Sequence, residues 1–454
     1  MAPPDLDMLA TRLGAHSDRM LQLILRAASR SSSIEPYHPW DKLRHRQPPD
    51  DMTAEEWWFV TKVARRSVQR ELALHDERGL PFTYALTDNI LRSIEEVNRR
   101  LSGTIGIGER VANAANRNSY LISSLMEEAI TSSQLEGAAT TRAVAKEMLR
   151  TGRAPANRDE RMIRNNYAAM LRVGDFRDEL ITPDRICEIQ RIVTEGTLRD
   201  PAAAGRFQQP GEQRVAVCDE FGSVLYAPPP AEQIAPLVDQ LCDFVNTPPD
   251  SGAYLPPVIR AIAAHFMIGY VHPFEDGNGR TARALFYWLM LREDYWLTEF
   301  IPISRILRKA PVQYAYSYLY TEQDDNDLTY FVIHQLNVIA TAIRDLQEYF
   351  TQKIREAREF QRTIATLPGE LNPRQHALLQ NALADPRTEY TVRGHADFHR
   401  VVRQTARDDL SALESLGYLV KDATGRRHTW HPAPYLSATL ASVDREPTGR
   451  RRSR

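Results

Sequence analysis

The sequence predicts a mainly α-helical protein with one small β-hairpin and a separate C-terminal unit of three helices and two strands. Three observations support this prediction. Segments with apolar residues at helical spacing follow one another through most of the chain. Two short apolar runs near residues 215 and 225 flank a turn-forming segment. From about Leu371 a new and shorter set of periodic elements begins.

Residues 1–112 are expected to form an N-terminal helical region. An apolar stripe predicts a first helix from about Asp5 to Ser29. Thr53 begins a capping box, so a second helix should start there, and we expect it to reach about His75. A third helix is expected from about Thr87 to Leu101.

A core region is expected over residues 113–345. Its first helix runs from Asn113 and ends at Glu136-Gly137, because glycine readily adopts the left-handed conformation of a helix C-cap. Thr140 or Thr141 can cap the next helix, which should run through about Leu149, and more helix is expected to about Leu171. Another helix should start at Thr182-Pro183, where proline occupies the first turn. A long helix, capped by Asp327, should reach about Ala365.

The small hairpin is expected at about residues 214–227. Its strand residues include Val215 and Val217 before the turn and Val224 and Tyr226 after it. Three consecutive prolines follow, which no strand continues through.

A polar loop of the core lies between two apolar segments that read as packed helices, Pro257–Tyr270 and Arg280–Arg292. The N-terminus of a helix offers free N–H groups and partial positive charge, which suits an anion. Gly277 and Gly279 let the backbone approach a phosphate closely, and their N–H groups with Asn278 would cradle its oxygens.

The remaining residues of this loop carry the chemistry. His272 suits proton abstraction from a hydroxyl near neutral pH. Asp276 is a hard oxygen ligand for Mg²⁺. Arg280 and Arg283 lie three residues apart on the second helix and suit bidentate phosphate contacts. Together they indicate nucleotide transfer from a triphosphate to a hydroxyl.

The segment His272-Pro273-Phe274-Glu275-Asp276-Gly277-Asn278-Gly279-Arg280 resembles the HPFx(D/E)GN(G/K)R signature of Fic-domain proteins, which are mostly AMP transferases. The resemblance implies a Fic-type helical bundle. It also implies transfer of AMP from ATP, with Mg²⁺ or Mn²⁺, to a Ser, Thr or Tyr hydroxyl of a target protein. Residues 272–283 would form the active-site loop.

A second stretch, Ser132-Ser133-Gln134-Leu135-Glu136-Gly137, resembles the (S/T)xxxE(G/N) inhibitory motif of the same family. The resemblance makes residues 119–137 an inhibitory helix that precedes the core. Glu136 would pair with Arg283 and hold this arginine away from the γ-phosphate of ATP.

The family resemblance also assigns the hairpin and one aromatic segment. The hairpin would be a flap that binds the target segment by strand addition. Tyr316 and Tyr318 lie in a helical segment similar to those that surround the nucleotide base, although packing in the core explains them equally well.

Residues 346–370 are expected to end the long helix, and residues 371–437 resemble a winged helix-turn-helix. This unit holds nine Lys and Arg residues against seven Asp and Glu between 371 and 430. That balance favours a protein-docking or dimer module over DNA binding, although Arg400, Arg403 and Arg407 or a wing with Arg426 and Arg427 would suit DNA phosphates. Residues 438–454 are expected to be a basic, disordered tail.

The composition describes an ordinary globular protein. A formal charge of −2 gives no global basic field for nucleic acid. Three cysteines without a CxxC pair argue against a thiolate zinc site and favour a reducing cytoplasm. Neither a signal peptide nor an apolar run of roughly 20 residues is expected, so we predict no contact with a membrane.

The sequence thus predicts a protein adenylyltransferase that is restrained by Glu136. Two alternatives remain open. In one, Glu136 orients a water molecule that removes AMP from a modified protein. In the other, the C-terminal unit binds DNA and the Fic domain senses a nucleotide. The sequence leaves open whether the protein is a homodimer.

Overall fold

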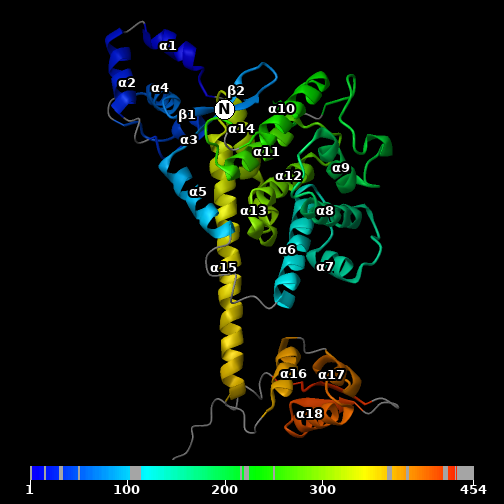
Figure 1. Cartoon of the computed structure of the whole chain (residues 1–454). Helices are drawn as coiled ribbons and strands as arrows, with labels where there is room; N and C mark the ends of the chain where they lie inside the picture. The colour runs from blue at the N-terminus through cyan, green and yellow to red at the C-terminus, as the bar shows by residue number, and fades with distance from the viewer. Residues whose placement is uncertain are drawn as a thin grey trace, which may run out of the picture. The chain divides into compact units, whose positions relative to one another are not determined.

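The structure is a computed structural model that describes residues 3–14, 17–29, 34–49, 52–102, 114–214, 217–218, 224–248, 251–365, 371–384, 388–422, 428–434 and 436. The chain divides into two compact units, residues 1–347 and residues 348–454 (Figure 1). Each unit is described by itself.

The first unit is built mainly from helices. Their bounds are α1 Leu6–Gly14, α2 Ser17–Ser29, α3 Trp40–Leu43, α4 Ala54–Arg66, α5 Asp88–Leu101, α6 Ala114–Leu135, α7 Arg142–Thr151, α8 Arg158–Asp175, α9 Pro183–Thr194, α10 Ile234–Asn246, α11 Pro257–Val271, α12 Asn278–Arg292, α13 Ile303–Lys309, α14 Pro311–Gln323 and α15 Thr329–Ala365. Two antiparallel hairpins accompany them, β1 Gln69–His75 with β2 Pro81–Ala85 and β3 Val217–Cys218 with β4 Val224–Tyr226.

The N-terminal region differs from the prediction in two places. The expected single helix is split into α1 and α2. The helix that Thr53 caps ends at Arg66, so its predicted extension to His75 is wrong. Residues 69–75 form β1 instead, because Leu72 and Leu74 alternate into the core at the two-residue period of a strand. The capping box at Thr53 is confirmed.

A buried charged cluster joins this region to the loop before α15. The Arg65 guanidinium is fully buried, stacks 3.7 Å from the ring centre of Tyr37 and donates to the hydroxyl of Tyr330 at 2.8 Å. Lys62 is 3% exposed and pairs with Asp324 at 2.7 Å. Removing Lys62 would leave the buried carboxylate of Asp324 without its paired cation, so this contact attaches the N-terminal region to the rest of the unit.

The centre of the unit is the pair α11 and α12, which pack against each other and are almost wholly buried. Helices α8 and α9 pack on α12, α10 packs on α11, and α6 packs on α8 and α13 (Figure 1). The loop between α11 and α12 is therefore surrounded by rigid helices.

The predicted helix ends in this region are confirmed. Thr141 caps α7, and Thr182 caps α9 with Pro183 in the first turn. Gly137 follows α6 with φ +93°, the left-handed conformation expected of a C-cap. Asp327 accepts the backbone N–H of Thr329 at 3.1 Å at the start of α15.

The second unit contains the predicted elements: α16 Pro373–Ala384, α17 Val392–His399, α18 Arg403–Ser415, β5 Leu419–Asp422 and β6 Thr429–Pro432. Trp430 of β6 lies 2% exposed in its core. Arg400, Arg403 and Arg407 are exposed, as a contact with phosphates or a partner would require. The predicted wing residues 426–427 and the tail at 438–454 lie outside the described residues.

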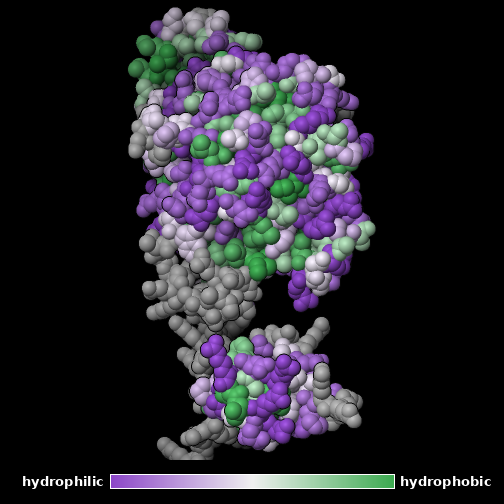
Figure 2. Space-filling model, turned by 45° about the vertical axis from the view of Figure 1, so that its right-hand side comes forward, coloured by the Kyte–Doolittle hydropathy of each residue, from purple (hydrophilic) through white to green (hydrophobic). Residues whose placement is uncertain are grey.

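Hydrophilic side chains cover most of the face shown in Figure 2, with separate hydrophobic patches between them. One apolar group on α1 and α2 is exposed, and it consists of Met8, Leu21, Ile24 and Leu25. Within the described residues, every helix is too short or too polar to cross a bilayer.

Candidate active site

The loop between α11 and α12 holds two residues in the left-handed conformation. His272 ends α11 with φ 49° and ψ 56°, and Gly277 precedes α12 with φ 89°. The carboxamide of Asn278 closes the loop: its oxygen accepts the N–H of Phe274 at 2.9 Å, and its nitrogen donates to the carbonyl of Phe274 at 2.8 Å. We expected this side chain to cradle phosphate oxygens. In the structure it fixes the loop, and the backbone N–H of Gly277 donates to the carboxylate of Asp276 at 2.5 Å.

His272 lies in an environment that favours the neutral imidazole. Burial lowers the pKa of His272 below its ordinary value of 6.5, opposed by a hydrogen bond with the backbone of Gly269. The positive charge of Arg214 lowers this pKa further, whereas Glu136 and Asp276 raise it. A neutral imidazole that bonds through one nitrogen can accept a proton on the other.

Asp276 and Arg280 form an ion pair within the first turn of α12. The carboxylate of Asp276 accepts from Nη2 of Arg280 at 3.0 Å and from Arg158 at 3.3 Å. Arg280 is fully buried and also donates to the carbonyl of Val193 at 2.6 Å. We expected Arg280 to face phosphate, yet two of its nitrogens are bonded to protein. Its Nε is buried without a partner among the described residues.

Arg283 is bonded to both predicted residues of the inhibitory motif. Its Nε donates to the hydroxyl of Ser132 at 2.8 Å, and its Nη2 contacts Oε1 of Glu136 at 2.8 Å and the carbonyl of Ser132 at 3.2 Å. Burial alone would lower the pKa of Arg283, but the carboxylate of Glu136 raises it. The third nitrogen, Nη1, has no partner among the described residues and is buried.

Glu136 also covers the first turn of α12. A Cβ atom built on Gly279 would lie 2.1 Å from Oε1 of Glu136 and 3.0 Å from Nη1 of Arg283. Only glycine therefore fits at position 279 while Glu136 is in this position. The carboxylate lies where a phosphate that approached the backbone N–H groups of α12 would lie.

Glu128 is a buried residue of α6 that the sequence analysis missed. It is 2% exposed and accepts the N–H of Ser304 at 2.9 Å, and the hydroxyl of Ser304 donates to it as well. Burial raises its pKa. Glu128 precedes Glu136 by eight residues and fixes α6 to α13, so the helix that carries the inhibitory motif is anchored.

The other candidate residues are less close to this loop. In the hairpin, Val224 is exposed. The hydroxyl of Tyr226 donates to the carbonyl of Tyr270. Val215 and the side chain of Val217 lie outside the described residues. The ring of Tyr318 packs on Phe266 and Phe331, with centroid distances of 5.1 and 4.6 Å. Tyr316 is 43% exposed and stacks on Tyr320. Both tyrosines thus contact other aromatic side chains.

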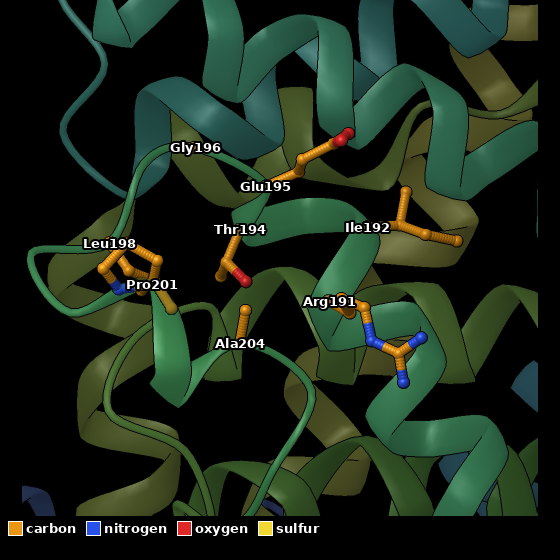
Figure 3. Close-up of a pocket in the computed structure, with 8 residues that line it drawn as sticks. All are labelled: Arg191, Ile192, Thr194, Glu195, Gly196, Leu198, Pro201 and Ala204. Carbon is orange, nitrogen blue, oxygen red and sulfur yellow. The ribbon is translucent and has the colours of Figure 1, made fainter.

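A cavity of about 390 Å³ lies beside the active-site loop, between α9 and the segment that follows it. Figure 3 shows Thr194, Pro201, Leu198 and Ala204 gathered around it, while Arg191 and Glu195 extend away. Thr194 also contacts the loop, because its methyl group would lie 2.8 Å from a Cβ atom on Gly277.

Comparisons with known proteins agree with this geometry. Residues 180–290 match the model of the Fic/DOC family. A protein adenylyltransferase Fic of Nematostella vectensis is 26% identical over 292 residues, 63% of this chain and 64% of that protein. A protein adenylyltransferase fic-1 of Caenorhabditis briggsae is 44% identical over 64 residues, 14% of this chain and 11% of that protein. The chain thus covers less than two thirds of the length of either relative.

A solved structure shares the fold. The crystal structure of a Fic family protein from Desulfovibrio desulfuricans G20 superposes with a TM-score of 0.52 and 17% identity, covering 77% of this chain and 98% of that one. The family match includes the whole loop from His272 to Arg283, and the helices around this loop are arranged as in that structure. The chain therefore contains, at residues 180–290, a segment that matches the Fic/DOC family.

Proposed function

We propose that the protein transfers AMP from ATP to a hydroxyl side chain of a target protein, and that Glu136 restrains this activity. The observation that carries the proposal is the contact of Glu136 with Arg283 and with the first turn of α12, at 2.8 Å from the guanidinium. A carboxylate bound there identifies the place as an anion site. The names of the curated relatives, protein adenylyltransferases, support the same reaction.

The reaction assigns a step to each group. The target hydroxyl attacks the α-phosphorus of ATP, and His272 accepts the proton of this hydroxyl. The bond from the α-phosphorus to the oxygen that bridges to the β-phosphate breaks, and pyrophosphate leaves. Arg283, once Glu136 has moved, and the N–H group of Gly279 bind the departing phosphates. Arg280 holds the turn through Asp276 and Val193.

Asp276 fits the role of a ligand for Mg²⁺ or Mn²⁺. Its side chain is 32% exposed at the edge of the loop, and the side chain of its partner Arg158 is 57% exposed. A single carboxylate suits a cation that binds mostly through nucleotide phosphates and water. Bound there, the cation would neutralise charge on the phosphates during transfer.

The proposal is tested with the Glu136→Gly protein and ATP that carries the label either on the α-phosphate or on the γ-phosphate. Label from the α-phosphate should enter protein, and label from the γ-phosphate should not. A Glu136→Gly, His272→Ala protein is the matched control and should incorporate neither. Incorporation of the γ-label would indicate phosphoryl transfer, and incorporation of neither label by Glu136→Gly would reject the proposal.

A further inference from the structure

The last turn of α11 receives an unusual set of hydrogen bonds. A helix leaves its final carbonyl groups without partners inside the helix. Here the carbonyls of four consecutive residues, from Tyr270 to Pro273, all accept hydrogen bonds from one segment, residues 208–226. This segment includes both ends of the β3–β4 hairpin.

Arg214 makes the central contacts of this set. Its Nη2 donates to the carbonyl of Val271 at 2.6 Å, and its Nη1 donates to the carbonyl of His272 at 2.9 Å. Its Nε donates to the carbonyl of Pro229 at 2.9 Å, and its Nη1 also contacts the side chain of Gln208. All of these acceptors are neutral. The arginine is therefore held by hydrogen bonds and by the partial negative charge of a helix C-terminus, and not by an ion pair.

Two further contacts complete the attachment. The backbone N–H of Gln208 donates to the carbonyl of Pro273 at 2.9 Å. The hydroxyl of Tyr226, at the end of β4, donates to the carbonyl of Tyr270. Arg214 precedes β3 and Tyr226 ends β4, so both ends of the hairpin are bound to the backbone that carries His272.

The backbone of His272 needs such support. Its φ of 49° lies in the left-handed region, which a histidine adopts only at an energetic cost. A residue stays in such a conformation only when several contacts from the surrounding structure hold it. The hydrogen bond from Arg214 reaches the carbonyl of this same residue.

We propose that Arg214 is a positioning residue that holds the backbone of His272 in its left-handed conformation and joins it to the hairpin on which the target would dock. A target segment added to β3 or β4 would thereby act on the same arginine that places the proton acceptor. The inference rests on the proposed AMP transfer for its kinetic test, but not for its structural test.

The kinetic test compares three variants in the Glu136→Gly background. Arg214→Ala removes every contact, and Arg214→Lys keeps the charge but cannot reach four acceptors from one nitrogen. Both should lower kcat by about 10- to 100-fold, because small misplacements of a catalytic group are that costly. Binding of ATP, measured by calorimetry, should stay unchanged. Arg206→Ala is the matched control, because Arg206 lies just before this segment and pairs with Glu212 inside it.

The structural test needs no substrate. Histidine ring signals are followed by NMR as a function of pH, and the signal of His272 is identified by its loss in His272→Ala. Arg214, Asp276 and, in the parent chain, Glu136 are the charged groups that act on this ring. Arg214→Ala should raise the pKa of His272, whereas Arg214→Lys should leave it close to that of the parent.

These outcomes separate the two proposals. If Glu136→Gly labels nothing but the His272 signal responds to Arg214→Ala, the proposed activity fails and the attachment stands. If Arg214→Ala retains the parental kcat and the parental His272 titration, the positioning role is rejected. If Arg214→Ala does not fold, Arg214→Lys decides: a parental kcat in that variant also rejects the role. Equal losses in Arg206→Ala would show a general effect on the segment and would overturn it as well.

Discussion

Replacing Glu136 by glycine should accelerate AMP transfer by an amount that follows from its contact with Arg283. The carboxylate lies 2.8 Å from Nη2 of an arginine that is 1% exposed, while Glu136 itself is 28% exposed. A hydrogen bond to a charged group of this kind contributes about 1.5–3 kcal/mol. ATP must displace this bond before its γ-phosphate meets Arg283. At about 1.4 kcal/mol for each factor of ten, the acceleration should be about 10- to 150-fold.

The assay is the initial rate of incorporation of α-labelled ATP at a nucleotide concentration well below saturation, where competition between Glu136 and ATP limits the rate. Glu136→Gln is the informative control, because it keeps the size of the side chain and removes its charge. Its rate should fall between those of the parent and Glu136→Gly. Equal rates in all three proteins would refute the reasoning, since the contact would then not compete with ATP. A rate for Glu136→Gln equal to that of the parent would show that the size of the side chain at position 136, which covers Gly279, restrains the rate and that its charge does not.

Three further predictions concern other parts of the chain. Because burial lowers the pKa of His272, its neutral form persists into mild acid, so the acid limb of the pH–rate profile of Glu136→Gly should have its midpoint below 6.5; a midpoint above that value would contradict the assignment. Ser132→Ala removes one neutral acceptor of Arg283, so it should raise the labelling rate by about 2- to 10-fold, less than Glu136→Gly; a lower rate would show that Ser132 supports activity. Trp430→Ala should destabilise the second unit by about 3–5 kcal/mol, seen as faster hydrogen exchange in residues 371–436, and unchanged exchange there would refute its place in the core.

The helices were predicted well because the residues that mark a helix end lie close together in the sequence. Thr141, Thr182 and Gly137 mark helix ends through contacts within a few residues, and all three are confirmed. The segment at 69–75 was expected to continue the helix that begins at Thr53. Its two buried leucines alternate instead, and pairing with β2 decided the outcome.

The candidate site was only partly predictable. The signature at 272–283 located the loop, and the motif at 132–137 located the residues that contact Arg283, because both are contiguous in sequence. The contacts of Arg158 with Asp276 and of Arg214 with His272 join residues 118 and 58 positions apart. An arginine that binds backbone carbonyls leaves no signal in a sequence. The bonds of Asn278 with the backbone of Phe274 were unpredictable for the same reason.

The carboxylate that occupies the anion site belongs to the same chain as the arginine it binds. Its effective concentration is therefore a fixed property of the fold and does not fall when the protein is diluted. An inhibitor supplied by a second molecule would dissociate at low abundance, but this one persists at any expression level. Under the proposed restraint, Arg283 becomes available to a nucleotide when an event moves the end of α6 or when a substitution changes the residue at position 136.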